Sequence, residues 1–221
     1  MFGLDHALAG LSNGGTLLLV LGVSLLLGLR HASDPDHLAA VTTLTAGSGE
    51  RGGRRGAALG FAWGGGHASS LFVFGLPIVL WRAYLPERVQ QGAEVAVGVL
   101  IAGLALWLLA RWHAGRLAPH AHAHVRSRLG AYGIGLVHGV GGSAGIGVLL
   151  LAAIPDRAVA VAGLAVFAFG TALSMAALSA GVGHSLAGRS LLRLAPALGV
   201  ASLAFGVWYA LGALDLAPYL F

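Results

Sequence analysis

Residues 28–41 read GLRHASDPDHLAAV, a stretch that places five ionisable side chains within eight positions of an otherwise apolar segment. The chain around it has 221 residues, of which 57% are hydrophobic and only 10% are charged. Soluble domains carry about 25% charged residues, so this composition excludes an ordinary soluble fold. It predicts an integral membrane protein, in which a buried run of ionisable groups needs a functional explanation.

The remaining sequence divides into six apolar runs, each of which is long enough to cross a membrane. About 20 helical residues span a hydrocarbon core of about 30 Å. Residues 1–15 hold no Lys or Arg, so they lack the basic region of a signal peptide, and the first run is expected to be retained. We predict an all-α integral membrane protein, one domain over residues 1–221, with about six transmembrane helices. They cover residues 16–45, 56–81, 92–112, 129–153, 158–184 and 191–214.

The arginines predict how these spans are oriented. All 13 basic residues are arginine, and nine lie in the connections after the first, third and fifth spans, against three in the alternate connections. Positive loops stay inside, so both termini are predicted to lie outside a plasma (inner) membrane. This distribution favours membrane orientation over nucleic-acid binding. The absence of cysteine excludes thiol redox chemistry and thiolate metal sites.

Three short patterns recur about 100 residues apart in the same order. GLRH at 28–31 is answered by GLVH at 135–138, and FAWG at 61–64 by FAFG at 167–170; GV followed by Trp nine residues later occurs at 98–107 and at 199–208. These matches predict two halves, about 16–112 and 129–214. Because each half has three spans, the second must be inverted, which is a transporter architecture with its substrate site near the midplane. Chance similarity in a chain rich in Gly, Ala and Leu is the alternative.

The ionisable stretch in the first span has the composition of a metal site. Helical spacing places His31 and Asp34 on one face, and Pro35 favours a kink that turns Asp36 and His37 towards the same centre. Imidazoles and carboxylates together suit divalent transition metals, whereas Ca²⁺ and Mg²⁺ prefer oxygen ligands alone. The alternative is an interfacial helix end, in which the arginine pairs with the aspartates and the histidines lie among lipid headgroups.

Two further histidines, His67 and His138, lie inside other spans among Gly and Ser residues. Small neighbours let helices approach closely, so both imidazoles are candidate metal ligands, although a lone membrane histidine can also bond a neighbouring helix. Other polar residues are predicted to orient the imidazoles or to line the path, with helix packing as the alternative: Arg30, Ser69, Ser70, Ser143, Thr171 and Ser174.

The connection 113–128 contains alternating histidines, His120, His122 and His124. Such a segment can hold a divalent metal loosely and exchange it quickly. On the predicted orientation it faces the cytoplasm, where it would collect metal for export or hand over imported metal. The alternative is a flexible loop without a metal.

The stretch RHASDPDH at 30–37 closely resembles the signature of the nickel/cobalt transporter (NiCoT) family, whose usual form is RHAxDADH. GHAS at 66–69 is similar to the second-helix pattern of that family. The chain differs in having Pro35 for Ala, six predicted spans for the usual eight, and no clear copy of the later motifs. HGVGGSA at 138–144 instead looks like the shorter urease-accessory-type membrane proteins of the same superfamily. The resemblance implies that His31, Asp34, Asp36 and His37 handle metal.

The sequence therefore predicts a non-enzymatic permease that takes up Ni²⁺ or Co²⁺ as its substrate and holds no cofactor. A nickel or cobalt efflux permease is the alternative within transport. A rhomboid-like intramembrane hydrolase would use the serine of GGSA at 141–144, but the last span holds no histidine, and neither HExxH nor a phosphate-binding P-loop occurs. The expected partners are the lipid bilayer, the metal ion and a cytoplasmic metallochaperone, with no nucleic acid.

Overall fold

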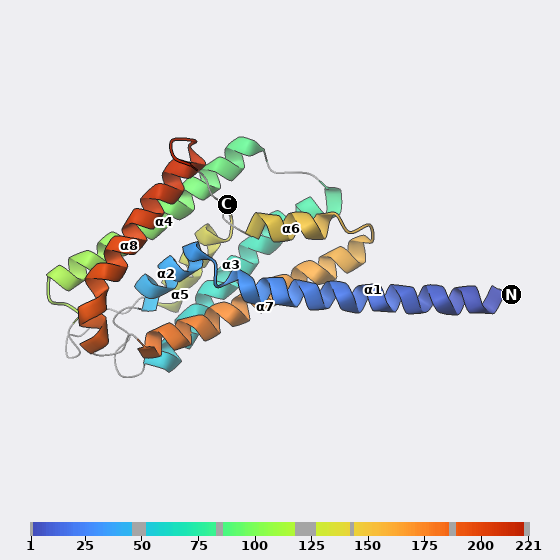
Figure 1. Ribbon diagram of the computed structural model, residues 1–221, viewed down its shortest axis with the longest axis horizontal. Helices are drawn as coiled ribbons and strands as arrows, with labels where there is room; N and C mark the ends of the chain where they lie inside the picture. Colours follow the sequence, from blue (N-terminus) through green and yellow to red (C-terminus); the bar gives the residue numbers. More distant parts are fainter. Residues whose placement is uncertain are drawn as a thin grey trace.

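The computed structural model describes the backbone of residues 2–45, 52–82, 86–117, 127–141, 144–185 and 189–218. Within these ranges every regular element is an α-helix, which confirms the all-α prediction. The helices, labelled in Figure 1, are α1 (Phe2–His31), α2 (Pro35–Thr45), α3 (Gly52–Trp81), α4 (Glu87–His113), α5 (Arg128–His138), α6 (Ala144–Ala152), α7 (Arg157–Ser185) and α8 (Arg189–Ala213).

Several of these helices can cross a membrane. Four are long and apolar enough alone, over Gly53–Trp81, Glu87–His113, Arg157–Ser185 and Arg193–Ala213. A fifth crossing is available when Leu17–His31 and Pro35–Thr45 are taken together as one span with a bend of 55°. The chain is thus a multi-pass membrane protein, and its described part offers four or five crossings rather than the six predicted.

The difference lies in the predicted fourth span, 129–153, which is wrong as one continuous crossing. Its residues form α5 and α6, of 11 and 9 residues, and at 1.5 Å per residue neither covers a 30 Å core. Glycine weakens a helix, and α5 ends where Gly139 caps it. At Gly141 the backbone lies against α4, where an added Cβ would be 2.6 Å from the carbonyl carbon of Ala93. The first predicted span is also broken, as Pro35 led us to expect.

The helices pack in two groups. In Figure 1, α3 and α7 lie side by side, with α1 against α7 and α5 against α3, while α4 and α8 form a separate pair. Close packing of α3 on α7 depends on small residues: Gly60 faces Ser179 and Gly64 faces Ala172, with no room for a side chain. This arrangement carries the ends of α1 and α5, together with α2, to the middle of α3.

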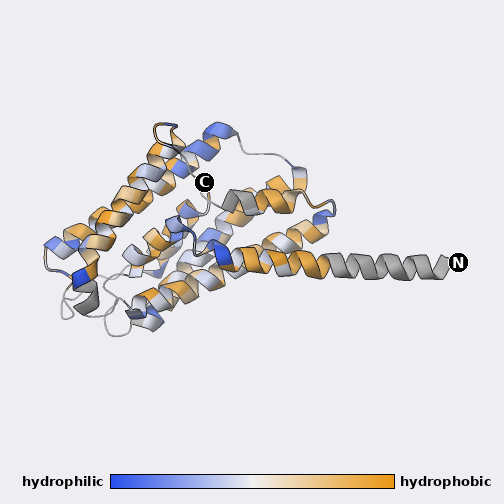
Figure 2. Cartoon of the chain, viewed as in Figure 1, coloured by the Kyte–Doolittle hydropathy of each residue, from blue (hydrophilic) through white to orange (hydrophobic). Residues whose placement is uncertain are grey.

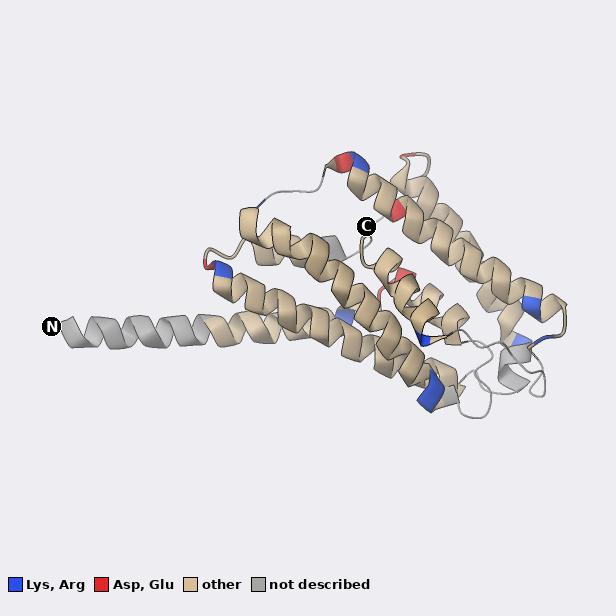
Figure 3. Cartoon of the chain, turned by 180° about the vertical axis from the view of Figure 1, so that it is seen from behind, with Lys and Arg blue, Asp and Glu red and all other residues tan. Residues whose placement is uncertain are grey.

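The surface of the helices is apolar along most of their length, as Figure 2 shows. Leu18, Phe61 and Phe169 are 73%, 65% and 65% exposed, which suits lipid contact and would be unusual in water. Most charged residues lie near helix ends, as Figure 3 shows from behind. At the break between α1 and α2 the helix ends lie inside the protein, and Asp36 there is almost fully buried.

Candidate metal site

The candidate site begins at the break between α1 and α2. Helix α1 ends at His31, and the turn closes with the Ser33 amide donating to the carbonyl of Arg30 at 2.9 Å. Pro35 then begins α2, a position where its missing N–H costs nothing because the first amides of a helix have no partner inside it. The break places His31 at one helix end and His37 at the start of the next, so that both rings face the same interior.

Four histidines meet there, each from a different helix. His31, His37, His67 and His138 come from α1, α2, α3 and α5, and none is more than 3% exposed. The ring centroids of His31 and His37 are 4.5 Å apart, those of His37 and His138 are 4.4 Å apart, and those of His67 and His138 are 5.9 Å apart. The structure therefore brings together all four histidines that the sequence proposed as ligands.

Two carboxylates hold these rings. Asp36 is 3% exposed and uses both oxygens: Oδ1 lies 3.1 Å from Nδ1 of His37, and Oδ2 lies 3.1 Å from Nε2 of His138. Asp34 lies 3.1 Å from Nδ1 of His31 through Oδ2. Its other oxygen is 3.7 Å from the guanidinium of Arg30, whose side chain is 74% exposed. Both aspartates proposed from the sequence thus contact histidines of the cluster.

Three ring nitrogens of the cluster are buried without a hydrogen-bond partner: Nε2 of His37, Nδ1 of His67 and Nδ1 of His138. Buried polar atoms are nearly always bonded, because leaving one unpaired costs about 1–3 kcal/mol. Three such atoms in one cluster need an explanation, and a bound ion would supply the missing partner.

The spacing of the donor atoms suits a transition-metal ion. His31, His37 and His67 form one group in which ligand atoms lie within 4.8 Å of one another, and Asp36, His37 and His138 form a second. Nε2 of His31 and Nε2 of His67 are 3.2 Å apart. Two nitrogens bound to one ion at about 2.0–2.1 Å are separated by roughly 2.9–3.4 Å, depending on whether the geometry is octahedral or tetrahedral. The pair therefore needs little movement to share an ion.

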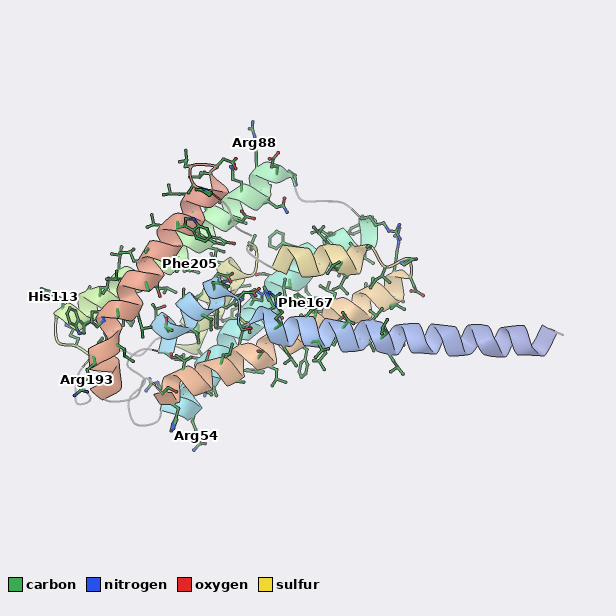
Figure 4. All side chains as sticks on the ribbon, viewed as in Figure 1. Arg54, Arg88, His113, Phe167, Arg193 and Phe205 are labelled. Atoms are coloured by element: carbon green, nitrogen blue, oxygen red, sulfur yellow. The ribbon has the colours of Figure 1, made fainter. Side chains whose placement is uncertain are left out.

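Aromatic side chains close the site on two sides. The Trp63 ring lies 5.6 Å from the rings of both His37 and His138, and the Phe167 ring lies 5.6 Å from His31. Figure 4 shows Phe167 beside the end of α1, with His113 and Arg193 far from it. We did not identify these aromatic residues as site residues from the sequence. In the sequence, FAWG and FAFG indicated only a repeat. Aromatic residues that line a site have no sequence pattern that distinguishes them from other apolar residues of a membrane helix.

Three of the predicted path residues make hydrogen bonds that join one helix to another. Ser70 donates to the carbonyl of Leu136 at 2.6 Å, and Ser174 donates to the carbonyl of Leu29 at 2.7 Å. Ser69 accepts from the Tyr132 hydroxyl at 2.9 Å. Thr171 is buried and donates to the carbonyl of Phe167 at 2.9 Å, within its own helix α7. A part in the ion path stays a prediction for each of them. Ser143 and the loop histidines His120, His122 and His124 lie outside the described residues.

Comparison with known proteins gives one informative likeness. The chain is similar to the urease accessory protein UreH of Bacillus sp. (strain TB-90), with 26% identity over 178 residues, covering 76% of this chain and 77% of that protein. At a coarse level this supports the resemblance to the nickel/cobalt transporter and urease-accessory group, and likeness to an accessory protein supports the prediction of a non-enzymatic protein. No family model matches the chain, and no solved structure does.

Proposed function

We propose that this protein is a secondary permease for a divalent transition metal, nickel or cobalt, which passes through the buried histidine cluster. The observation that carries the proposal is the meeting of four imidazoles from four helices, with three ring nitrogens lacking a partner. Ionisable groups inside a membrane bundle are costly and mark substrate pathways. Imidazole-rich surroundings favour Ni²⁺, Co²⁺, Zn²⁺ or Cu²⁺ over Ca²⁺ and Mg²⁺. The family resemblance of residues 30–37 selects nickel and cobalt from this set.

The membrane potential alone can drive uptake of such an ion. Moving two charges through 100 mV releases about 4.6 kcal/mol, because each charge contributes about 2.3 kcal/mol. At about 1.4 kcal/mol per factor of ten, this corresponds to more than a thousandfold accumulation. Hydrolysis of a nucleotide is not needed, which agrees with the lack of a P-loop sequence.

We further propose that α5 and α6 together cross the membrane once, as the bent pair of α1 and α2 does, so that the two halves are inverted repeats that rock around the site. His31 and His138 each end a helix at a break, and Gly28 and Gly135 lie three residues before them. Gly28 of α1 lies against the backbone of Phe167 and Thr171 in α7, whereas Gly135 of α5 lies against the backbone of Trp63 and His67 in α3. Both contacts are accounted for by a symmetry operation that superposes the first half on the second, with α1 placed on α5 and α3 on α7.

Two hydrogen bonds between helices are related by the same symmetry operation. Ser70 of α3 bonds the carbonyl of Leu136, which lies one residue after Gly135. Ser174 of α7 bonds the carbonyl of Leu29, which lies one residue after Gly28. The α4–α8 pair supports it as well, because Gly98 faces Ala210 and Gly199 faces Leu109. In these matched contacts, residues of α3 correspond to residues of α7 that lie 104 positions later, whereas the FAWG and FAFG match pairs residues 106 positions apart. On the alignment from the contacts, Thr171 is the counterpart of His67.

In the proposed cycle, the ion loses its water to the cluster when the halves close around it. The first half supplies His31, His37 and His67, and the second half supplies His138. Rocking of one half against the other then opens the cluster to the opposite side of the membrane. With the predicted orientation, uptake delivers the ion to the cytoplasmic side, where a metallochaperone would receive it. Export is the same cycle in reverse.

The experiment is flux of radioactive nickel and cobalt into proteoliposomes of known orientation under an imposed potential. Wild-type protein should accumulate the ion above empty liposomes. His31→Ala should abolish accumulation, and Asp36→Asn should lower it about tenfold or more at ion concentrations below the Kd. His184→Ala is the matched control, because this histidine is exposed at the end of α7. Reversing the potential tests direction. No flux above empty liposomes from folded wild-type protein would overturn the permease.

A further inference from the structure

We propose that Asp36 is a positioning residue and not a ligand, so that the transported ion is bound by imidazole nitrogens alone. This rests on the proposed function, because it concerns how the same site holds its ion. Asp36 would act by fixing which nitrogen of His37 and of His138 is free to bind. The first of these rings belongs to the first half of the chain and the other to the second half.

The first step is that both oxygens of Asp36 are already engaged. Oδ1 lies 3.1 Å from Nδ1 of His37 and Oδ2 lies 3.1 Å from Nε2 of His138. An ionised carboxylate only accepts hydrogen bonds, so each of these nitrogens carries a hydrogen and donates it. In a neutral imidazole the opposite nitrogen then has a lone pair. That nitrogen is Nε2 in His37 and Nδ1 in His138.

These two lone-pair nitrogens are two of the three ring nitrogens of the cluster that are buried without a hydrogen-bond partner. The hydrogen bonds to Asp36 therefore explain the unpaired nitrogens of His37 and His138. The carboxylate selects the tautomer of each ring, and the opposite nitrogen keeps a lone pair that can bind the ion. A metal-binding histidine commonly donates its second N–H to a carboxylate in this way, which orients the ring and raises its basicity.

A different aspartate orients His31. Its Nδ1 lies 3.1 Å from Oδ2 of Asp34, but its Nε2 already has a partner, because it lies within hydrogen-bond distance of Nε2 of His67 at 3.2 Å. An ion bound by both Nε2 atoms would take the place of the hydrogen between them. The two aspartates thus orient three of the four rings. His67 contacts the other rings rather than an aspartate, and its Nδ1 has no hydrogen-bond partner.

A carboxylate oxygen of Asp36 lies within 4.8 Å of donor atoms of His37 and His138, which is close enough to bind the same ion. Direct binding by Asp36 would nevertheless carry a cost that imidazole binding avoids. An ion between Asp36 and either ring would displace a hydrogen bond and leave a buried N–H of His37 or His138 without its acceptor. Asp36 also joins α2 of the first half to α5 of the second. Keeping this bond makes the lone pair of His138 available only while the two halves are closed, which links ion binding to closure.

The test is metal binding by the purified full-length protein, followed by X-ray absorption of the Co²⁺-loaded and Ni²⁺-loaded forms. The wild type should show a shell dominated by imidazole nitrogen. In Asp36→Asn the amide oxygen accepts from only one ring, so affinity should fall about 10–100-fold and the shell should lose one imidazole. Asp34→Asn is the matched variant, and its loss of imidazole should be confined to His31.

A carboxylate oxygen in the wild-type shell that disappears in Asp36→Asn, with the imidazoles retained, would overturn the inference while leaving the permease intact. The double variant Asp36→Asn with His138→Ala gives a second readout. If Asp36 acts through His138, Asp36→Asn should cost less affinity in that background than alone, and fully additive costs would argue against this role. If Asp36→Asn does not fold, the wild-type spectrum decides between the two shells. Failure of the wild type to bind either ion overturns the proposed function together with the inference.

Discussion

Nε2 of His138 lies 3.1 Å from Oδ2 of Asp36, although 102 positions separate the two residues in the chain. The contact joins the break after α5 to the start of α2, and both residues are almost fully buried. It makes the site a property of the whole fold, because neither half contains the complete set of groups.

Binding of the proposed substrate should stabilise the folded protein. Ni²⁺ or Co²⁺ at 100 times its Kd should raise the free energy of unfolding by about 2.7 kcal/mol, because the ion binds the folded cluster and not the separated histidines. Thermal unfolding in detergent measures this as an increase in Tm. The increase should be absent in His67→Ala and absent for Ca²⁺ and Mg²⁺. Equal stabilisation by Ca²⁺ would argue against an imidazole site.

Adding a methyl group to Gly135 should separate α5 from α3. A Cβ there would overlap the carbonyl oxygen of Trp63, so Gly135→Ala should lower the free energy of unfolding by about 1–3 kcal/mol and displace His138. Gly133→Ala on the same helix is the control, since nothing lies within 4 Å of its added Cβ. Denaturation and Co²⁺ binding of both variants measure the effect. Equal behaviour of the two variants would contradict the close packing described here.

The inverted repeat predicts that Gly28 behaves as Gly135 does. A Cβ on Gly28 would overlap the carbonyl oxygen of Phe167, and we expect Gly28→Ala to reduce flux as strongly as Gly135→Ala. Gly22→Ala is the matched control on α1, because its added Cβ meets nothing within 4 Å. Flux measurements on the three variants test this expectation. A defect limited to Gly135→Ala would count against equivalent roles for α1 and α5.

The aromatic wall should be needed for its area rather than for its polar atom. Trp63→Phe keeps a ring against His37 and His138 and should bind Co²⁺ with affinity close to that of the wild type. Trp63→Ala should lower stability by about 3–5 kcal/mol and weaken binding, because it opens a cavity beside both imidazoles. Trp81→Ala, on the same helix but 68% exposed, controls for loss of a tryptophan. Normal Co²⁺ binding by Trp63→Ala would show that this ring is not needed to hold the imidazoles in place.

The orientation predicted from the arginines can be tested with single cysteines, because the chain has none of its own. Arg116→Cys should react with a membrane-impermeant thiol reagent only from the cytoplasmic side. Pro155→Cys, in the connection between α6 and α7, should react only from outside. Labelling of intact cells and of inverted vesicles measures both. The opposite pattern would reverse the topology and with it the assigned direction of uptake.

Much of this arrangement could be predicted from the sequence because burial of ionisable groups in an apolar chain is rare. His31, Asp36 and His37 interrupt a span, and His67 and His138 lie in Gly-rich surroundings that permit close helix approach. Those signals are local in the chain, and the structure brings all five residues together. The all-α class of the fold could also be predicted, because it follows from the apolar composition of a membrane-spanning chain.

The rest depended on contacts that hydropathy does not record. Residues 129–153 are mostly apolar, so hydropathy predicts one span there. The break after His138 instead goes with the cap at Gly139 and the approach of Gly141 to α4. The hydrogen bond between Asp36 and His138 could not be inferred either, since it joins residues from different helices. The same holds for the part that Trp63 plays against two imidazoles.

The most direct test of the account is nickel flux by His138→Ala compared with His184→Ala in proteoliposomes under an imposed potential. His138 is the ligand that the second half contributes, and His184 is exposed at the end of α7. If both halves build the site, His138→Ala should lose at least nine-tenths of the flux, on the order of the tenfold loss expected for removal of a site group, while His184→Ala retains it. Undiminished flux through folded His138→Ala would contradict a site built from both halves.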